Sequence, residues 1–379
     1  MNFDLTQDQI MIRNTVRDFA EAEIKPKAEH VDKTGEFPYD TFMKMGELGF
    51  LGLPISEEYG GAGADTIAYA LAVEEVGRAC GSHGLSYAAA VSLGCNPFAA
   101  FGTEEQKQKW LVPLAEGKIL GAFGLTEPNA GSDASGTQTT AVLEGDEWVV
   151  NGSKCFITNV SFAKVCVVTA LTDRSRGSKG ITAIIVPTDT PGFSTSTPYE
   201  KLGLKGSNTA EIILDNVRVP KENVLGTVND GFIQFMKTLD GGRISIGALS
   251  VGIAQAAYEA ALQYAKERKQ FGQSISKFQA IQFKLADMAM HIELARNAVH
   301  KAAWLKDQGR PFGKEAAMAK LFASEICMKA CDQAVQIHGG YGYMKEYPVE
   351  RMFRDAKLME IGEGTSEIQR IVIARHIGC

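Results

Sequence analysis

A glutamate between two glycines, near the carboxyl end of the chain, has unusually bare surroundings. Glu363 lies between Gly362 and Gly364 in the segment MEIGEGTSEIQR. The glycines remove side-chain bulk around the carboxylate and allow backbone conformations closed to other residues. Ser366 and Gln369 have the spacing of a capping box, which predicts a helix directly behind this turn. A carboxylate with so little steric shielding is a candidate for chemistry on a ligand. It could also be a loop acid that lies at a helix N-terminus and has no catalytic role.

A loop with anion-binding composition is the second candidate: FGLTEPNAGSD, residues 123–133. Short side chains and exposed amides of this kind can form a nest for an anion. Thr126 and Ser132 add hydroxyl donors. A loop that only joins two domains has the same composition, so the pattern leaves both interpretations open.

An aromatic and a hydroxyl side chain are paired in the segment SKCFITN, on a predicted strand. Phe156 and Thr158 are two residues apart, so we expect them to project from the same side of the strand. The aromatic ring could cover one face of a flat heterocycle while the hydroxyl donates a hydrogen bond to its edge. An ordinary strand face is the alternative.

Two further segments lie at the ends of predicted helices. ERKQFG carries Arg268 and Phe271, and QIHGGYGY carries Gln336, Gly339 and Gly340. An arginine at a helix terminus is usually solvated or paired, and two glycines after a helix usually make a C-cap. Each segment is therefore a weak signal by itself.

The elements that must position these residues divide the chain into three parts. Residues 1–120 show helical patterns, and 229–379 show longer helices rich in small residues, which suit a tightly packed bundle. Helix starts in the first part are marked by capping residues: Thr6 with Gln9, Asp65, and Thr103 with Gln106.

The middle part, residues 121–228, has a different character. Five β-rich runs separated by turn residues replace the helical period: TTAVLE, EWVVNGSKCFIT, AKVCVVTAL, GITAIIVP and AEIILDNVRVP. These runs are not interleaved with helices, and no GxGxxG or GxxxxGK[ST] motif is present. A doubly wound nucleotide-binding fold is therefore not expected.

The composition argues against several other classes of protein. The 379 residues are 45% hydrophobic and 22% charged, as in soluble globular proteins, and we find no stretch near the ~20 apolar residues of a membrane span. The net charge of −6 disfavours nucleic acid as the main partner. Seven cysteines without a CxxC pair, among them Cys327 and Cys331, are expected to be reduced core residues. The six histidines lack metal-ligand spacing, so no metal site is expected.

Taken together and in order, the motifs LTEPNAGSD, KCFITN, RKQFG, QIHGGYGY, YPVERMFRDAK and EGTSEIQR resemble the acyl-CoA dehydrogenase family over essentially the whole chain. The resemblance is strongest to the short-chain, butyryl-CoA type from bacteria. It implies a mostly α, α+β fold with an N-terminal helical domain (1–120), a central β-barrel-like or sandwich domain (121–228) and a C-terminal four-helix bundle (229–379). It also implies FAD as the cofactor and a homotetramer built as a dimer of dimers.

By this resemblance, residues from five of the six motifs would contact FAD. The flavin would be lined by the loop and the strand, with the Thr158 hydroxyl near N5: Phe123, Leu125, Thr126, Gly131, Ser132, Phe156, Ile157 and Thr158. The pyrophosphate and adenosine would be held by Arg268, Phe271 and Gln279, with Gln336, Gly339 and Gly340 of the partner subunit. Thr365 and Glu367 would touch the FAD near a helix start. Phe156 stands where many relatives carry tryptophan, and it can still stack.

By the same resemblance, Glu363 would be the catalytic base. It would remove the pro-R α-proton of an acyl-CoA thioester while the β-hydrogen leaves as hydride to flavin N5, which gives a trans-2-enoyl-CoA. A carboxylate with an ordinary pKa of ~4.3 is too weak a base for this proton. Hydrogen bonds to the thioester oxygen, from the Glu363 N–H and a flavin ribityl hydroxyl, would stabilise the enolate, and burial by substrate would raise the carboxylate's basicity. Gly364 would keep this backbone close to the substrate.

The resemblance also implies substrate contacts from Ser132, Asp240, Gly241, Gly242, Arg243 and Gly364. Members that act on isovaleryl groups carry their base at the position of Gly242, and here the loop has Glu363 instead. Ala88, Ala89 and Ala90 are candidates for the acyl-tail pocket, but small residues equally suit helix packing. Medium-chain and branched short-chain acyl-CoA therefore remain alternatives to a short straight chain.

Electron transfer flavoprotein is the acceptor that the resemblance implies. The N-terminus reads directly as a helix with no signal or transit peptide, so we expect a cytoplasmic bacterial enzyme, one of fatty acid β-oxidation by resemblance. Among rivals, an acyl-CoA oxidase is usually much longer, and a flavin monooxygenase or nitroalkane oxidase would lack Glu363 or carry aspartate there. A DNA-associated relative would need a basic C-terminal face, and a purely helical scaffold would be colourless.

Overall fold

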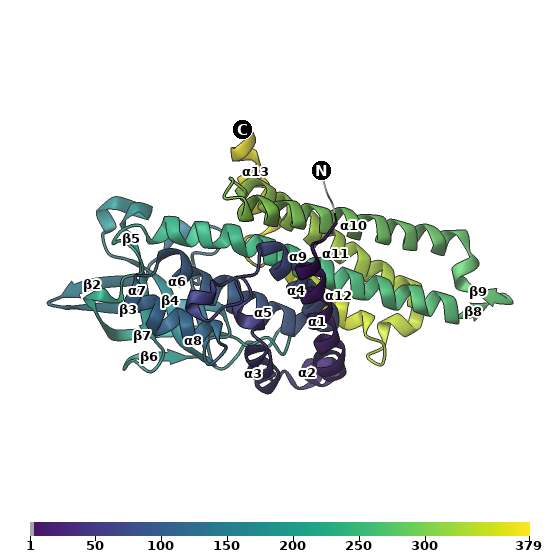
Figure 1. Ribbon diagram of the computed structural model, residues 1–379, viewed down its shortest axis with the longest axis horizontal. Helices are drawn as coiled ribbons and strands as arrows, with labels where there is room; N and C mark the ends of the chain where they lie inside the picture. The colour runs from purple at the N-terminus through teal and green to yellow at the C-terminus, as the bar shows by residue number, and fades with distance from the viewer. Residues whose placement is uncertain (1–3) are drawn as a thin grey trace.

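The computed structural model describes residues 4–379, in which helices precede and follow a central sheet (Figure 1). The first helices are α1 (Gln7–Phe19), α2 (Ala28–Thr34), α3 (Tyr39–Glu47), α4 (Thr66–Ala79), α5 (Gly81–Ala89), α6 (Asn96–Phe101), α7 (Glu104–Gln106) and α8 (Val112–Ala115). Three π-helical segments extend them: η1 (Ala20–Ile24), η5 (Ala90–Cys95) and η6 (Lys107–Leu111).

Capping residues explain where several of these helices begin. At α1 the Gln9 N–H donates to the Thr6 hydroxyl (3.2 Å), and the Thr6 N–H donates to Gln9 Oε1 (2.9 Å). Thr103 and Gln106 make the same reciprocal pair at α7. Asp65 accepts from a backbone N–H in the first turn of α4. These bonds satisfy donors that helix geometry leaves free, and the three predicted starts are confirmed.

One curled sheet of seven strands occupies the middle of the chain. Its strands are β1 (Leu120–Gly124), β2 (Thr140–Glu144), β3 (Glu147–Thr158), β4 (Ala163–Leu171), β5 (Ile181–Pro187), β6 (Phe193–Thr195) and β7 (Thr209–Pro220). The order is β1-β4-β2-β3-β7-β6, and β5 pairs with β4. β1 and β2 run parallel to β4, whereas the other pairs are antiparallel. The five predicted strands are present, and β1 and β6 are additional.

Long helices return after the sheet: α9 (Gly231–Glu267), α10 (Gln279–Asp307), α11 (Gly313–His338), α12 (Val349–Met359) and α13 (Ser366–Ile377). A small hairpin of β8 (Lys269–Gln270) and β9 (Gln273–Ser274) joins α9 to α10. α9 packs against α4, α10, α11 and α12, so it is the central helix of the molecule. Contrary to our sequence analysis, α9 is long and apolar enough to span a membrane, but 78% of its most apolar stretch is buried inside the protein. Such burial is typical of a core helix.

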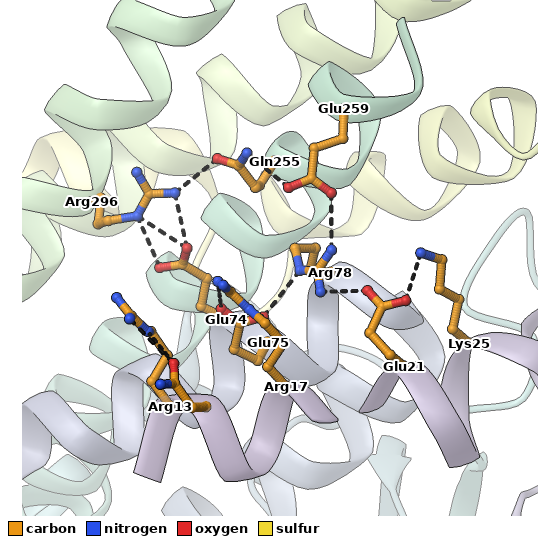
Figure 2. Close-up of polar contacts among 11 residues, drawn as sticks. Arg13, Arg17, Glu21, Lys25, Glu74, Glu75, Arg78, Gln255, Glu259 and Arg296 are labelled. Carbon is orange, nitrogen blue, oxygen red and sulfur yellow. Dashed lines mark hydrogen bonds and ion pairs between the residues drawn. The ribbon is translucent and has the colours of Figure 1, made fainter. Parts of the chain in front are cut away.

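A network of arginines and glutamates ties α1 to the packing around α4 (Figure 2). Glu75 on α4 is buried and accepts hydrogen bonds from Arg17 of α1 and Arg78 of α4. Six further labelled residues extend this network. Glu21, Lys25 and Glu74 belong to the N-terminal part, whereas Gln255 and Glu259 lie on α9 and Arg296 lies on α10. The N-terminal helices are therefore fixed to the central helix by charge as well as by apolar packing.

The cysteines follow the sequence expectation with one exception. Six are free and buried, including Cys327 and Cys331, whereas Cys379 is exposed at the carboxyl end. The expectation that all seven are core residues was therefore wrong for Cys379. Within residues 4–379, no group of three or more His, Cys, Asp or Glu side chains is arranged to hold a metal ion.

Candidate active site

Glu363 lies in a left-handed turn between α12 and α13. Glu363 has a φ of 51° and Gly364 a φ of 94°. A positive φ strains a glutamate, and such strain is concentrated at functional sites. The helix start differs from the prediction, because Thr365 and not Ser366 is the N-cap of α13. The Thr365 hydroxyl accepts a backbone N–H from the first turn at 3.3 Å, which leaves Ser366 inside the helix.

Two buried side chains hold this turn through its carbonyl groups. Lys320 of α11 donates from Nζ to the Gly364 carbonyl oxygen at 2.8 Å. Gln369 of α13 donates from Nε2 to the same oxygen at 2.9 Å and to the Glu363 carbonyl at 3.2 Å. Gln369 was predicted to complete a capping box, but its side chain binds the turn instead. Since neither side chain is exposed, both donors are shielded from water.

The Glu363 carboxylate points toward α9. Its Oε2 atom is buried and has no hydrogen-bond partner among the residues that the structure describes. A Cβ atom added to Gly242 of α9 would overlap this oxygen and lie 2.9 Å from Glu363 Cδ. Glycine at position 242 therefore leaves the space that the carboxylate occupies. A buried carboxylate oxygen without a partner is unfavourable, so its presence requires an explanation such as a role toward a ligand.

The electrostatic surroundings make Glu363 an acid that titrates near neutrality. Burial raises the pKa of Glu363 to about 7, although the positive charges of Lys320 and Arg243 oppose the rise. Burial also lowers the pKa of Lys320 to about 8, against the attraction of Glu363. A carboxyl group with a pKa near 7 can both take up and release a proton at neutral pH, as a general base must.

The α9 segment that faces this turn combines charge and open space. Arg243 is buried and forms an ion pair with Asp240, while its Nε has no partner. Burial lowers the pKa of Arg243 and raises the pKa of Asp240. A Cβ atom on Gly241 would meet only Asn96 Nδ2 and Lys306 Nζ, each at 3.7 Å. The segment predicted to contact substrate thus lies beside Glu363.

The loop after β1 is anchored by a buried ion pair that the sequence analysis did not identify. Lys154 Nζ lies 2.7 Å from Glu127 Oε1, and the Lys154 side chain is not exposed at all. Glu127 also accepts from the backbone N–H groups of Gln138 (2.6 Å) and Thr139 (3.0 Å). The ion pair therefore fixes a loop whose predicted cofactor contacts are half-buried or exposed: Leu125, Thr126, Gly131 and Ser132.

The predicted contacts on β1 and β3 are less uniform. Phe123 is buried with its ring stacked on Phe235 at 3.9 Å between centroids, and Ile157 lies in the sheet core. These two residues can therefore meet a ligand only through their backbones. Phe156 has a φ of 59° at a β-bulge and is 65% exposed. The bulge adds a residue at this point, yet burial still alternates from Phe156 (exposed) through Ile157 (buried) to Thr158 (half-buried), as expected if Phe156 and Thr158 project from one side.

A second group of predicted residues lines a pocket of about 440 Å³ at the carboxyl end of α9. The pocket includes Arg268, Gly339 and Gly340, together with the unpredicted Gln270 and Tyr341. The Arg268 guanidinium lies over the Tyr341 ring, 5.4 Å from its centroid. A basic group over an aromatic ring, beside open glycine backbone, suits an anionic ligand.

The remaining residues predicted for this group are exposed. Phe271 in the hairpin is 93% exposed and has a φ of 52°. Gln279 and Gln336 are exposed and do not line the pocket. Thr365 and Glu367 instead lie at the start of α13, next to the Glu363 turn.

A single chain keeps the two groups of residues apart. Gly242, which faces Glu363, and Arg268 are separated by about 39 Å along α9 at 1.5 Å per residue. Figure 1 shows the β8–β9 hairpin at the opposite end of the molecule from the sheet. The sequence analysis assigned only Gln336, Gly339 and Gly340 to a partner subunit. Within one chain Arg268 lines the same pocket as these two glycines, and the assignment of the residues to different subunits stays a prediction.

Lys320 and Lys154 are the functional candidates that the sequence analysis missed. Lys320 interrupts the apolar stretch AMAKLFA, whereas Lys154 lies between the run NGS and the apolar residues CFI of a predicted strand. A lysine is almost never fully buried unless it is paired, so a lysine on an apolar face could have signalled a buried polar contact. The partner of each lysine is not evident from the pattern.

Three family models match the chain. They are described as acyl-CoA dehydrogenase N-terminal domain (residues 6–118), middle domain (122–217) and C-terminal domain (229–378). A probable acyl-CoA dehydrogenase of Bacillus subtilis is 70% identical over 378 residues. A short-chain-specific acyl-CoA dehydrogenase of Clostridium acetobutylicum is 52% identical over 377 residues, and both matches cover 100% of each chain.

Solved structures agree with these matches. Butyryl-CoA dehydrogenase from Megasphaera elsdenii has a TM-score of 0.98 at 47% identity, over 100% of both chains. A chain from a structure of the electron transferring flavoprotein of Acidaminococcus fermentans has a TM-score of 0.99 at 51% identity, also over 100% of both. An acyl-CoA dehydrogenase complexed with FAD from Bacillus anthracis has a TM-score of 0.94 at 39% identity, over 99% of this chain and 67% of that one. The chain therefore belongs to the acyl-CoA dehydrogenase family of FAD-dependent oxidoreductases.

Proposed function

We propose that this protein dehydrogenates short, straight-chain acyl-CoA thioesters to trans-2-enoyl-CoA, with Glu363 as the base that removes the α-proton. The observation that carries the proposal is the Oε2 atom of Glu363, which is buried against Gly242 and has no hydrogen-bond partner in the described part of the chain. A structural carboxylate is normally paired or solvated. One that is held free in a strained turn is suited to act on a substrate atom.

The surroundings of Glu363 supply the basicity that the reaction needs. Burial raises its pKa to about 7, so above that pH the carboxylate is ionised and more basic than an ordinary glutamate. A thioester bound next to the Glu363 carboxylate expels water, which raises the basicity further. The Glu363 backbone N–H is our candidate donor to the thioester oxygen, where negative charge develops as the α-proton leaves.

FAD, the cofactor of this family, supplies the acceptor for the β-hydrogen, which leaves as hydride. The described residues suit this ligand. Arg268 offers a forked, charge-assisted contact for a pyrophosphate. No atom lies within 4 Å of a Cβ added to Gly339 or Gly340, so ligand atoms can approach this backbone closely. The exposed Phe156 ring is available to stack on a flat heterocycle.

We infer a homo-oligomer, and by family resemblance a homotetramer. The Arg268 pocket and the Glu363 turn are too far apart for one FAD to bridge within a chain, so Arg268 of the partner subunit would complete the site. Apolar side chains on the last helices are exposed in the single chain and support association: Phe283, Met290, Leu294, Met318, Phe322, Ile371 and Ile377. Sedimentation analysis and FAD retention in Arg268→Ala test this inference.

The proposed preference for short chains is supported by the relatives from Clostridium acetobutylicum and Megasphaera elsdenii, which are named for short-chain substrates. Medium-chain or branched short-chain acyl-CoA is the alternative.

Electron transfer flavoprotein is the proposed acceptor, because a chain of nearly the same structure comes from work on that protein in Acidaminococcus fermentans. By resemblance to bacterial members of the family, we also propose that the enzyme works in the cytoplasm, in fatty acid β-oxidation.

The test combines substrate range with removal of the base. Steady-state rates are measured with straight acyl-CoA from butyryl to octanoyl, and with isobutyryl- and isovaleryl-CoA. We expect the highest kcat/KM with butyryl-CoA, and anaerobic bleaching of the yellow protein by it. Glu363→Gln should retain FAD and bind acyl-CoA but lose turnover by several orders of magnitude. Retained turnover in Glu363→Gln would move the base elsewhere, and a higher kcat/KM with octanoyl- or isovaleryl-CoA would replace the substrate assignment.

A further inference from the structure

Lys320 is a buried cation in the middle of α11. Its side chain has no solvent exposure and lies on a helix whose small neighbours Ala316, Ala319 and Ala323 are also buried. The one hydrogen bond described for its ammonium group goes to the Gly364 carbonyl oxygen, at 2.8 Å. The two residues are 44 positions apart, so α11 reaches the turn that carries Glu363 through this contact.

Burying an ammonium group is unfavourable unless a partner compensates for the loss of water. A methionine would fill a similar space without that penalty. The contact with Gly364 therefore suggests that the charge and the donor of Lys320 serve the neighbouring residue. Gln369 already donates to the same oxygen, so Lys320 is not required merely to satisfy it.

The charged groups around Glu363 come from several elements. Lys320 of α11 and Arg243 of α9 act on it as cations, and Arg243 is itself paired with Asp240. Glu363 also interacts electrostatically with the Tyr69 hydroxyl of α4, which donates a hydrogen bond to a backbone carbonyl. Lys320 is influenced in turn by two further carboxylates, Glu360 and Glu367. Among residues 4–379, no carboxylate forms an ion pair with Lys320, whereas Arg243 is paired with Asp240, so the charge of Lys320 is the less neutralised one.

We propose that Lys320 is a positioning residue for Glu363: its ammonium group fixes the Gly364 carbonyl in the left-handed turn, and its charge keeps the Glu363 carboxylate ionised at the working pH. This inference rests on the proposed role of Glu363 as the base. Lys320 donates to the turn and does not itself exchange a proton with substrate.

The test separates the charge of Lys320 from its hydrogen bond. Lys320→Met removes both, whereas Gln369→Met removes only hydrogen bonds to the same turn. For each FAD-loaded variant, kcat/KM for butyryl-CoA is measured from pH 5.5 to 9 with ferrocenium as the oxidant. We expect the acid limb of the profile to move up by about one pH unit in Lys320→Met, because the cation that favours ionised Glu363 is gone. In Gln369→Met the rate should fall, while the limb stays where it is in the natural protein.

Two further measurements keep the outcome decisive. Amide hydrogen exchange across residues 359–369 should be faster in Lys320→Met, because the turn loses a donor. Lys320→Arg, which retains the charge and donors, should restore the acid limb. A Lys320→Met enzyme with FAD bound and an unmoved limb would overturn the inference. If that variant does not fold, Lys320→Gln gives the same comparison, and an unmoved limb there overturns it equally.

Glu363→Gln distinguishes this inference from the proposed function. If Glu363→Gln retains turnover, the assignment of the base fails, and with it the basis for Lys320. If Glu363→Gln is inactive while the Lys320 variants keep the natural pH profile, only the inference about Lys320 fails. An inactive Glu363→Gln together with a shifted limb in Lys320→Met supports both.

Discussion

The Glu363 carboxylate occupies the space into which a side chain at position 242 would extend. Its Oε2 atom overlaps the place of a Cβ on Gly242, although the two residues are 121 positions apart in the sequence. A side chain at 242 and a carboxylate from 363 therefore exclude each other in this conformation. This relationship gives a physical reason to expect a base at only one of the two positions, on α9 or on the turn.

Gly242→Ala should damage catalysis while leaving the fold and the FAD in place. The added methyl group would displace the carboxylate, and a displacement of about 1 Å can cost ~100-fold in rate. Gly241→Ala is the matched comparison, because its nearest neighbours are 3.7 Å away and the same methyl group fits there. We expect kcat to fall at least ~100-fold in the first variant and much less in the second. Similar losses in the two variants, measured with butyryl-CoA, would contradict the geometry.

A glutamate introduced on α9 should be able to replace the catalytic base on the turn. Glu363→Gly alone lacks a base, and Gly242→Glu alone forces two carboxylates into one space. In the double variant Gly242→Glu/Glu363→Gly, the new glutamate can use the space that Glu363 vacates. Its turnover should exceed that of Glu363→Gly by at least ~10-fold, since a positioned base typically contributes 10²–10⁴-fold. Stopped-flow reduction by butyryl-CoA measures this, and a double variant no faster than Glu363→Gly would show that the two positions do not share one site.

Local features of this fold were predictable because they depend on a few neighbouring residues. The caps at Thr6, Asp65 and Thr103 each follow from a side chain and the N–H two or three residues later. The same reasoning misplaced the start of α13 by one residue, since Thr365 and Ser366 have the same capping chemistry. Sequence spacing does not decide between two adjacent hydroxyl residues.

Features that depend on distant partners were not predictable in this way. β1 contains two glycines in five residues, and it is a strand because it pairs in parallel with β4, about forty residues later. Likewise, the apolar segment around Lys320 predicts a core helix but not that its ammonium group meets Gly364. The order of motifs made Glu363 the candidate base, whereas the contacts that hold Glu363 required the packing of α9, α11 and α13.

The buried carboxylate of Glu75 should contribute substantially to stability. It accepts from Arg17 and Arg78, so Glu75→Gln leaves two guanidinium groups with a weaker, neutral partner. Breaking a buried ion pair costs about 3–5 kcal/mol, and because Arg17 is half exposed we expect about 2–3 kcal/mol here. Asp146→Asn, in the exposed pair with Lys221, should change the melting temperature little. Equal melting temperatures for both variants would show that solvent already screens the network.

Glu363 should lower the stability of the folded protein as the pH rises. Its pKa is about 7 in the folded state and 4.5 as the ordinary value, so the folded protein binds the extra proton between these pH values. The free energy of unfolding therefore falls as the pH increases from 4.5 to 7, by up to about 3 kcal/mol from this group. The Glu363→Gln variant cannot ionise at this position. Its free energy of unfolding should therefore exceed that of the natural protein only slightly at pH 5 and by the largest amount at pH 8. Asp355, whose pKa burial also raises to about 7, is present in both proteins and cancels in the comparison. Melting temperatures at equal FAD content should differ by several degrees more at pH 8 than at pH 5; a difference that does not change with pH would mean that the carboxylate is solvated.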